Sequence, residues 1–92
     1  MTAAYGRRMA EWDPQRYIWE QIAEIIEARI EDGTYGPHHL LSESRIAGEF
    51  GVARMTARRA LRHLKERGLI VTLPAKGSFP ARRNGGDGGA QE

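Results

Sequence analysis

Residues 50–68 read FGVARMTARRALRHLKERG, and this stretch carries two interleaved helical patterns. At about 100° per residue, one side of a helical wheel holds small and apolar residues, namely Thr56, Ala57, Ala60, Leu61 and Leu64. A stripe about 80° wide on the other side holds basic residues, namely Arg54, Arg58, Arg62 and Lys65. The stretch therefore predicts an amphipathic helix over about 54–67 that buries one face and exposes the other.

The sequence on either side of this helix predicts two more helices and a β-hairpin. Asp13-Pro14 is a favourable helix start, and Gly33 can end a helix in the left-handed conformation. Ser42 is a good N-cap for a short helix. The expected bounds are about 14–32 and 43–50 for these helices, 69–73 and 78–81 for two strands, and 74–77 for their turn. The predicted fold class is mainly α with a small β-hairpin, which must pack on the helices to be stable.

The first expected helix separates apolar from acidic residues. Its apolar stripe consists of Ile18, Ile22, Ile25, Ile26 and Ile30. Its opposite face carries Glu20, Glu24, Glu27 and Glu31, which are typical of a solvated helix face. Trp19 is expected in the core, whereas Trp12 and Tyr17 stay open between a core position and a dimer contact.

The two ends of the chain lack such periodicity. Residues 1–12 mix small and basic residues, and we expect a flexible arm there. Residues 82–92 contain four glycines and almost nothing to bury, which predicts a disordered tail. The ordered domain is therefore expected over 13–81, in a chain of 92 residues that has room for a single small core.

The net charge of +2 hides a division along the chain. Residues 11–43 hold eight acidic against two basic side chains, whereas residues 44–83 hold ten basic against two acidic ones. A basic second half is typical of a surface that meets a polyanion such as nucleic acid, although solvated faces can also cluster charge by chance.

Several classes of protein are disfavoured by what the sequence lacks. There is no cysteine, no apolar run near the roughly 18 residues of a membrane span, and no secretory signal pattern, so we expect a protein of the reducing cytoplasm. No arrangement of a nucleophile, base and acid is visible, and we expect neither an enzyme nor a cofactor. His38 and His39 are adjacent and point apart, so a metal site is not expected.

Two short helices joined by a glycine turn, the second of them basic, are typical of a helix-turn-helix. Over residues 17–79 the chain resembles the winged helix-turn-helix domain of the GntR (gluconate-repressor) family of bacterial transcription regulators. The matching segments are 18–23, 32–37, 40–43, 50–61, 68–70 and 76–79. The string Val-x-Arg-x-Thr-x-Arg-x-Ala-Leu, which begins at Val52, is the most specific of them.

The resemblance and the basic stripe together predict a DNA-binding surface. Its expected members are Ser42, Arg45, Arg54, Met55, Thr56, Arg58, Arg59, Arg62, Lys76 and Gly77. The helix would enter the major groove, where arginine can pair with a guanine edge or hold a phosphate. Lys76 and Gly77 match the family's wing tip, which approaches the minor groove.

The chain departs from the family pattern at five positions. Leu41 stands where the family usually has proline, and Ser44 where it has an arginine that helps to hold DNA. Arg45 follows one position later, but one residue turns a side chain by about 100°, so it is no direct substitute. Arg45 also stands where the family has a glutamate that completes a capping box with the serine. Ala53 replaces the usual serine or threonine cap, and Ala75 replaces a glycine of the wing. These departures predict weaker or altered binding to DNA by a domain of the same fold.

The expected function is that of a transcriptional regulator that binds specific sequences of double-stranded DNA. Repression is the expected mode of regulation. Two copies, in a homodimer that forms on DNA, are expected on repeated or palindromic half-sites. No small-molecule effector is expected, because only about a dozen residues follow the wing. Two alternatives remain: an architectural protein of a mobile element, such as a recombination directionality factor, and a winged-helix module that binds proteins.

Overall fold

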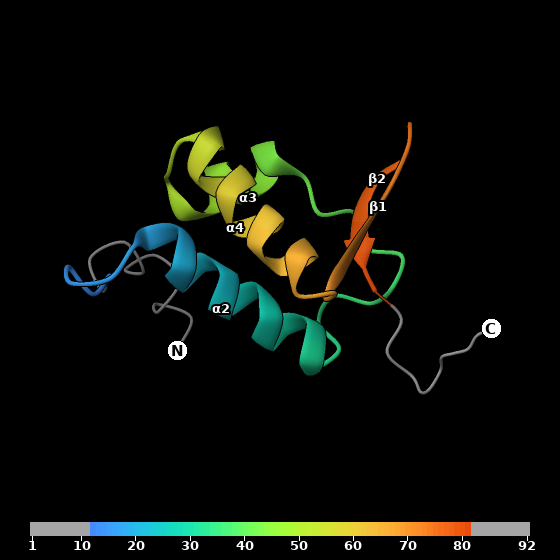
Figure 1. Ribbon diagram of the computed structural model, residues 1–92, viewed down its shortest axis with the longest axis horizontal. Coiled ribbons are helices and arrows are strands. Elements are labelled where there is room, and N and C mark those ends of the chain that lie inside the picture. The colour runs from blue at the N-terminus through green and yellow to red at the C-terminus, as the bar shows by residue number, and fades with distance from the viewer. Residues whose placement is uncertain (1–11, 82–92) are drawn as a thin grey trace.

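The computed structural model describes residues 12–81, in which three helices precede a β-hairpin. The elements are α2 Ile18–Glu31, α3 Glu43–Phe50, α4 Arg54–Glu66, β1 Ile70–Leu73 and β2 Gly77–Pro80. In Figure 1, α4 runs through the middle of the molecule, with α2 and α3 beside it and the hairpin beyond its C-terminal end. The predicted order of elements is confirmed, whereas the expected arm and tail lie outside the described residues except for Trp12.

The start of the first helix is a correction, because α2 begins at Ile18 and not at Pro14. Residues 13–16 form a separate turn in which the Arg16 N–H donates to the Asp13 carbonyl at 3.2 Å. The Asp13 carboxylate accepts from the Gln15 N–H at 2.9 Å and so caps this turn instead of a helix. As a result Ile18, the first member of the predicted stripe, is 37% exposed.

Gln21 holds that turn against α2. Its side chain is buried, and its Oε1 accepts from the Asp13 N–H at 3.0 Å. Its Nε2 donates to the carbonyls of Asp13 at 3.0 Å and Arg16 at 3.2 Å. A buried amide that satisfies the backbone on both sides gives the chain a fixed path into the helix.

The core lies along the inner face of α4. Ala57 and Ala60 are fully buried, and their small side chains let α2 and α3 approach the α4 backbone closely. The largest fully buried side chains are Phe50, Ile22, Ile26 and Leu64. The predicted burial of one face of α4 is therefore confirmed, and Trp19 packs at the edge of the same core.

The ends of α3 and α4 follow the predicted chemistry. The Ser42 Oγ accepts from the Arg45 N–H at 3.2 Å, whereas Ala53 provides no side-chain cap. Gly51 ends α3 with a φ of 68° and opens a three-residue turn, 51–53, before α4. Two helices joined by so short a turn form a helix-turn-helix.

The hairpin is tied to the connector that precedes α3. β1 and β2 are antiparallel, with Val71 opposite Phe79. The Leu41 N–H donates to the Ser78 carbonyl at 2.8 Å, on the outer side of β2. This is the position where the resemblance leads one to expect proline, which has no N–H to donate. Leu41 is also buried, so the departure from the pattern adds a link between the connector and the wing.

The turn of the wing contains a strained residue. Ala75 has a φ of 66°, a region that favours glycine. We predict that Ala75→Gly raises the free energy of unfolding by about 1 kcal/mol, because the Cβ no longer clashes with its own backbone. Urea unfolding followed by circular dichroism would measure the change. The control is Ala28→Gly on the exposed side of α2, which should lower stability by about 1 kcal/mol, and equal effects of the two variants would contradict the assignment of strain.

Replacement of Gln21 tests whether its hydrogen bonds hold the 13–16 turn against α2. We expect Gln21→Met to lower the free energy of unfolding by about 1–2 kcal/mol, since the Asp13 backbone would lose its partners at little cost in volume. Gln15→Met at an exposed position is the matched control and should change stability little. If both variants have the urea midpoint of the parent, the Gln21 side chain does not hold the turn.

Candidate nucleic-acid interface

The outer face of α4 forms a basic ridge, defined here as Arg54, Arg58, Arg62 and Lys65. All four residues are exposed, and the Arg54 and Arg58 side chains are 65% and 47% exposed. The buried alanines and leucines of the same helix fix its rotation, so the ridge faces away from the core. Met55, 65% exposed, and the half-buried Thr56 lie in the first turn beside the ridge.

A groove of about 510 Å³ lies between the start of α3, the ridge and the wing. Five of the predicted site residues line it together: Ser42, Arg58, Arg62, Lys76 and Gly77. They come from three separate elements, and the backbone of the wing approaches the connector closely here. At Gly77, where φ is 115°, a Cβ atom would lie 2.6 Å from Leu40 Cδ1. The structure thus brings half of the predicted site to one place.

The remaining predicted residues flank this groove. Arg54 lies in the first turn of α4, and Met55 and Thr56 line a second hollow of about 610 Å³ on the α2 side of the ridge. Arg58 and Arg62 line both hollows, so the ridge stands between them.

Arg59 and Arg45 lie outside the first groove, although Arg59 lines the second hollow. The Arg59 guanidinium lies 5.2 Å from the centre of the Trp19 ring, beside α2, where a cation–π contact holds it. Arg45 lines a smaller hollow with Tyr35, His39 and Glu49. Its turn away from the groove is the consequence of the one-residue shift that the sequence showed, since one residue rotates a side chain by about 100°.

Glu43 is the residue of this surface that sequence reasoning missed. Its carboxylate accepts from Arg58 at both oxygens, from Nε at 3.0 Å and from Nη2 at 3.2 Å. The Arg54 Nη2 lies 3.6 Å from the same carboxylate. The only available signal was the position of Glu43 after the cap Ser42, because the contact with Arg58 joins two helices and has no sequence pattern.

This contact changes the proton affinities of both partners. Hydrogen bonds from Arg58, followed by the charges of Arg58 and Arg54, hold the pKa of Glu43 below its ordinary value. The same carboxylate raises the pKa of Arg58. Glu43 is therefore ionised at neutral pH, and the pair carries no net charge.

The placement of α3 relative to α2 depends on Arg29. Its Nη1 donates to the Tyr35 hydroxyl at 2.6 Å, and its Nη2 lies 2.6 Å from the Glu49 Oε2 in α3. These contacts raise the pKa of Arg29, with the hydrogen bonds to Glu49 as the largest cause. The link ties the C-terminal end of α3 and the connector at Tyr35 to α2.

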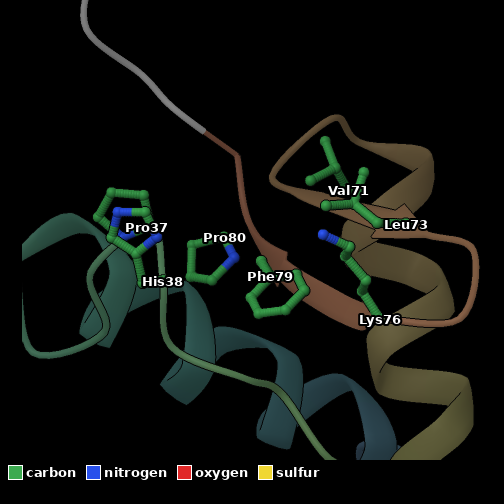
Figure 2. A pocket seen from close by; sticks show the side chains of 7 residues that line it. All are labelled: Pro37, His38, Val71, Leu73, Lys76, Phe79 and Pro80. Carbon is green, nitrogen blue, oxygen red and sulfur yellow. The ribbon is translucent and has the colours of Figure 1, made fainter.

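The far side of the wing is apolar. A groove of about 540 Å³ lies between the connector and the hairpin. Figure 2 shows the residues that line it, namely Pro37, His38, Val71, Leu73, Lys76, Phe79 and Pro80. The hydroxyls of Thr72 and Ser78 lie 3.0 Å apart on the opposite face of the hairpin, toward α4. The hairpin thus directs the Thr72 and Ser78 hydroxyls toward the groove beside the basic ridge and Val71, Leu73 and Phe79 toward the other groove, while Lys76 lines both.

The two histidines of the connector occupy different surroundings. His38 lines the apolar groove of Figure 2, whereas His39 stacks on Tyr35 with the ring centres 4.1 Å apart. Neither lies with the basic ridge. No helix within residues 12–81 combines the length and the apolar character that crossing a bilayer requires.

A helix-turn-helix followed by a hairpin that borders its second helix is a winged helix-turn-helix domain, and the predicted fold class is confirmed. Residues 18–79 match the family model described as bacterial regulatory proteins, gntR family. The chain belongs to this family. The resemblance drawn from the motifs is therefore confirmed over nearly the same residues.

Individual relatives agree with this membership. The histidine utilization repressor of Klebsiella aerogenes is 38% identical over 69 residues, which cover 74% of this chain and 29% of the repressor. The chain thus spans less than a third of that curated relative's length.

Two solved structures share the fold. A GntR family transcriptional regulator from Listeria monocytogenes superposes with a TM-score of 0.72 at 30% identity, covering 78% of this chain and 64% of that one. The DNA-binding domain of AraR, solved in complex with the operator ORX1, has a TM-score of 0.65 at 28% identity, covering 76% and 90%.

The contact between Glu43 and Arg58 predicts a specific dependence of stability on pH. Because the folded-state pKa of Glu43 is lowered from 4.5, the contact stabilises the fold above that pH and is lost as the pH falls through the folded-state pKa. Urea midpoints of the parent and of Glu43→Gln should differ at neutral pH and converge in acid. A difference that persists after Glu43 is protonated would contradict this origin.

Proposed function

We propose that the protein is a transcriptional regulator that binds double-stranded DNA at specific sequences and represses by occupying an operator. The observation that carries the proposal is the basic ridge on the second helix of a helix-turn-helix, which shares one groove with the lysine of the wing. An α-helix fits the major groove of B-DNA, and a ridge of arginines offers the donors that guanine edges and phosphates accept.

The comparisons support this proposal at the level of the domain. The relative from Klebsiella aerogenes, a repressor by name, and the operator-bound AraR domain match 74% and 76% of this chain. The family model spans residues 18–79, which hold the ridge and the wing.

The roles of the residues follow from where they lie. Arg58 and Arg62 stand on the crest of the ridge between the two hollows and reach base edges. Met55 offers an exposed apolar side chain to a thymine methyl group. Lys76 and the backbone at Gly77 meet the phosphates or the minor groove beside the wing.

The other predicted residues serve the DNA backbone. Ser42 lies at the start of α3, where its backbone borders the groove. Arg54 and Thr56 lie in the first turn of α4. Arg45 and Arg59 flank the surface and contribute attraction to phosphates at its edges. Two copies on neighbouring half-sites would supply the specificity that one small domain lacks.

The proposal predicts that substitution of Arg58 and substitution of Lys76 weaken DNA binding in different ways. Selection of bound sequences from random duplex DNA defines the site. Arg58→Ala should then lose about ten- to a hundredfold in affinity for that site and relax the preference at one base pair, because a base contact is removed. Lys76→Ala should weaken binding to all sequences alike and reduce the salt dependence, because a phosphate contact is removed.

The control for these variants is Arg16→Ala, which removes an exposed arginine of the turn before α2, away from the ridge. It should bind the selected site as the parent does. If the parent selects no sequence, the proposal is wrong. Bending of DNA over several direct repeats would favour the architectural alternative. The absence of any salt-dependent affinity for DNA would favour a protein-binding module.

A further inference from the structure

Arg58, in the middle of the ridge, is already hydrogen-bonded in the free protein. Arg58 gives its Nε–H and one Nη2–H to the two oxygens of Glu43, at 3.0 and 3.2 Å. Glu43 is held in turn by its place in the first turn of α3, directly after the Ser42 cap. Among the described residues that line the groove, Glu43 is the one acidic side chain.

The geometry leaves the useful edge of Arg58 open. A guanidinium has five N–H donors. Glu43 takes two of them along the side of the group, through Nε and Nη2. The two Nη atoms still present a parallel pair of N–H groups at the end of the side chain, which is the pair that a guanine O6 and N7 accept.

The charge of the pair matters as much as its shape. An unpaired arginine is attracted to any phosphate, and this attraction is independent of sequence. Glu43 neutralises Arg58 and lies 3.6 Å from Arg54, so it lowers the positive potential at the start of the ridge. A guanine edge is uncharged, and its hydrogen bonds to Arg58 require donors instead of net charge.

We propose that Glu43 is a specificity-determining residue, which positions Arg58 for a base edge and weakens its attraction to phosphates. The role rests on the proposed function, because it requires that Arg58 reads DNA. Glu43 acts through Arg58 and makes no base contact of its own. It is therefore a positioning residue, and its removal should raise non-specific binding while it lowers discrimination.

The test compares Glu43→Gln with the parent on the selected duplex, on the same duplex changed at the base pair that Arg58 reads, and on an unrelated duplex. Binding to the unrelated duplex should tighten severalfold, and its salt dependence should increase by about one phosphate contact. Discrimination at the Arg58 base pair should fall about tenfold or more. A merely structural role would weaken binding to all three duplexes together.

Two further variants separate charge from geometry. Glu43→Asp keeps the negative charge but is shorter, so it should lose discrimination while binding to the unrelated duplex stays near that of the parent. Glu24→Gln removes the same charge from α2, where its partner is Arg16, and should leave discrimination unchanged. Circular dichroism at the temperature of the assay confirms that every variant is folded.

The decisive measurement is a double-mutant cycle with Arg58→Ala. In that background Glu43→Gln should no longer affect discrimination at the Arg58 base pair. An effect that persists would show that Glu43 contacts the base itself, and unchanged discrimination in the single variant would show that it has no role in specificity. Either result overturns the inference while the proposed function stands, whereas a parent that selects no sequence overturns the proposed function.

Discussion

The rest of the structure depends on the packing of α4, which must be buried on one side and exposed on the other along its whole length. The fully buried Ala57 and Ala60 set this condition, because they are small enough for α2 and α3 to lie close to the helix. A larger residue at either position would force the neighbouring helices apart. The close packing also fixes the rotation of α4, so that its four basic side chains form one ridge.

The wing reaches the ridge because several short-range contacts hold the connector in place. The Leu41 N–H is bonded to the wing, Gly77 packs against Leu40, and the Arg29 contacts hold the connector and α3 relative to α2. Together they leave the polar face of the hairpin toward α4 and its apolar face toward the groove of Figure 2.

Much of the fold follows from local sequence chemistry. The 3.6-residue period of α4, the Ser42 cap and the glycine ends of the helices give element types and bounds that the structure confirms within a few residues. The start of α2 could not be predicted, because Asp13-Pro14 suits a turn as well as a helix. The buried Gln21, eight residues away from Asp13, decides for the turn.

The candidate site, like the fold, could be predicted from the sequence only in part. The residues of the basic ridge share one helix face, so the sequence by itself determined which side chains are displayed together. Whether Arg58 is free or paired, and whether Arg45 and Arg59 lie at the groove or beside it, was decided only by the tertiary structure. The reason is physical: a helical period places side chains relative to one axis, whereas the contact between Glu43 and Arg58 depends on the distance and angle between two helices.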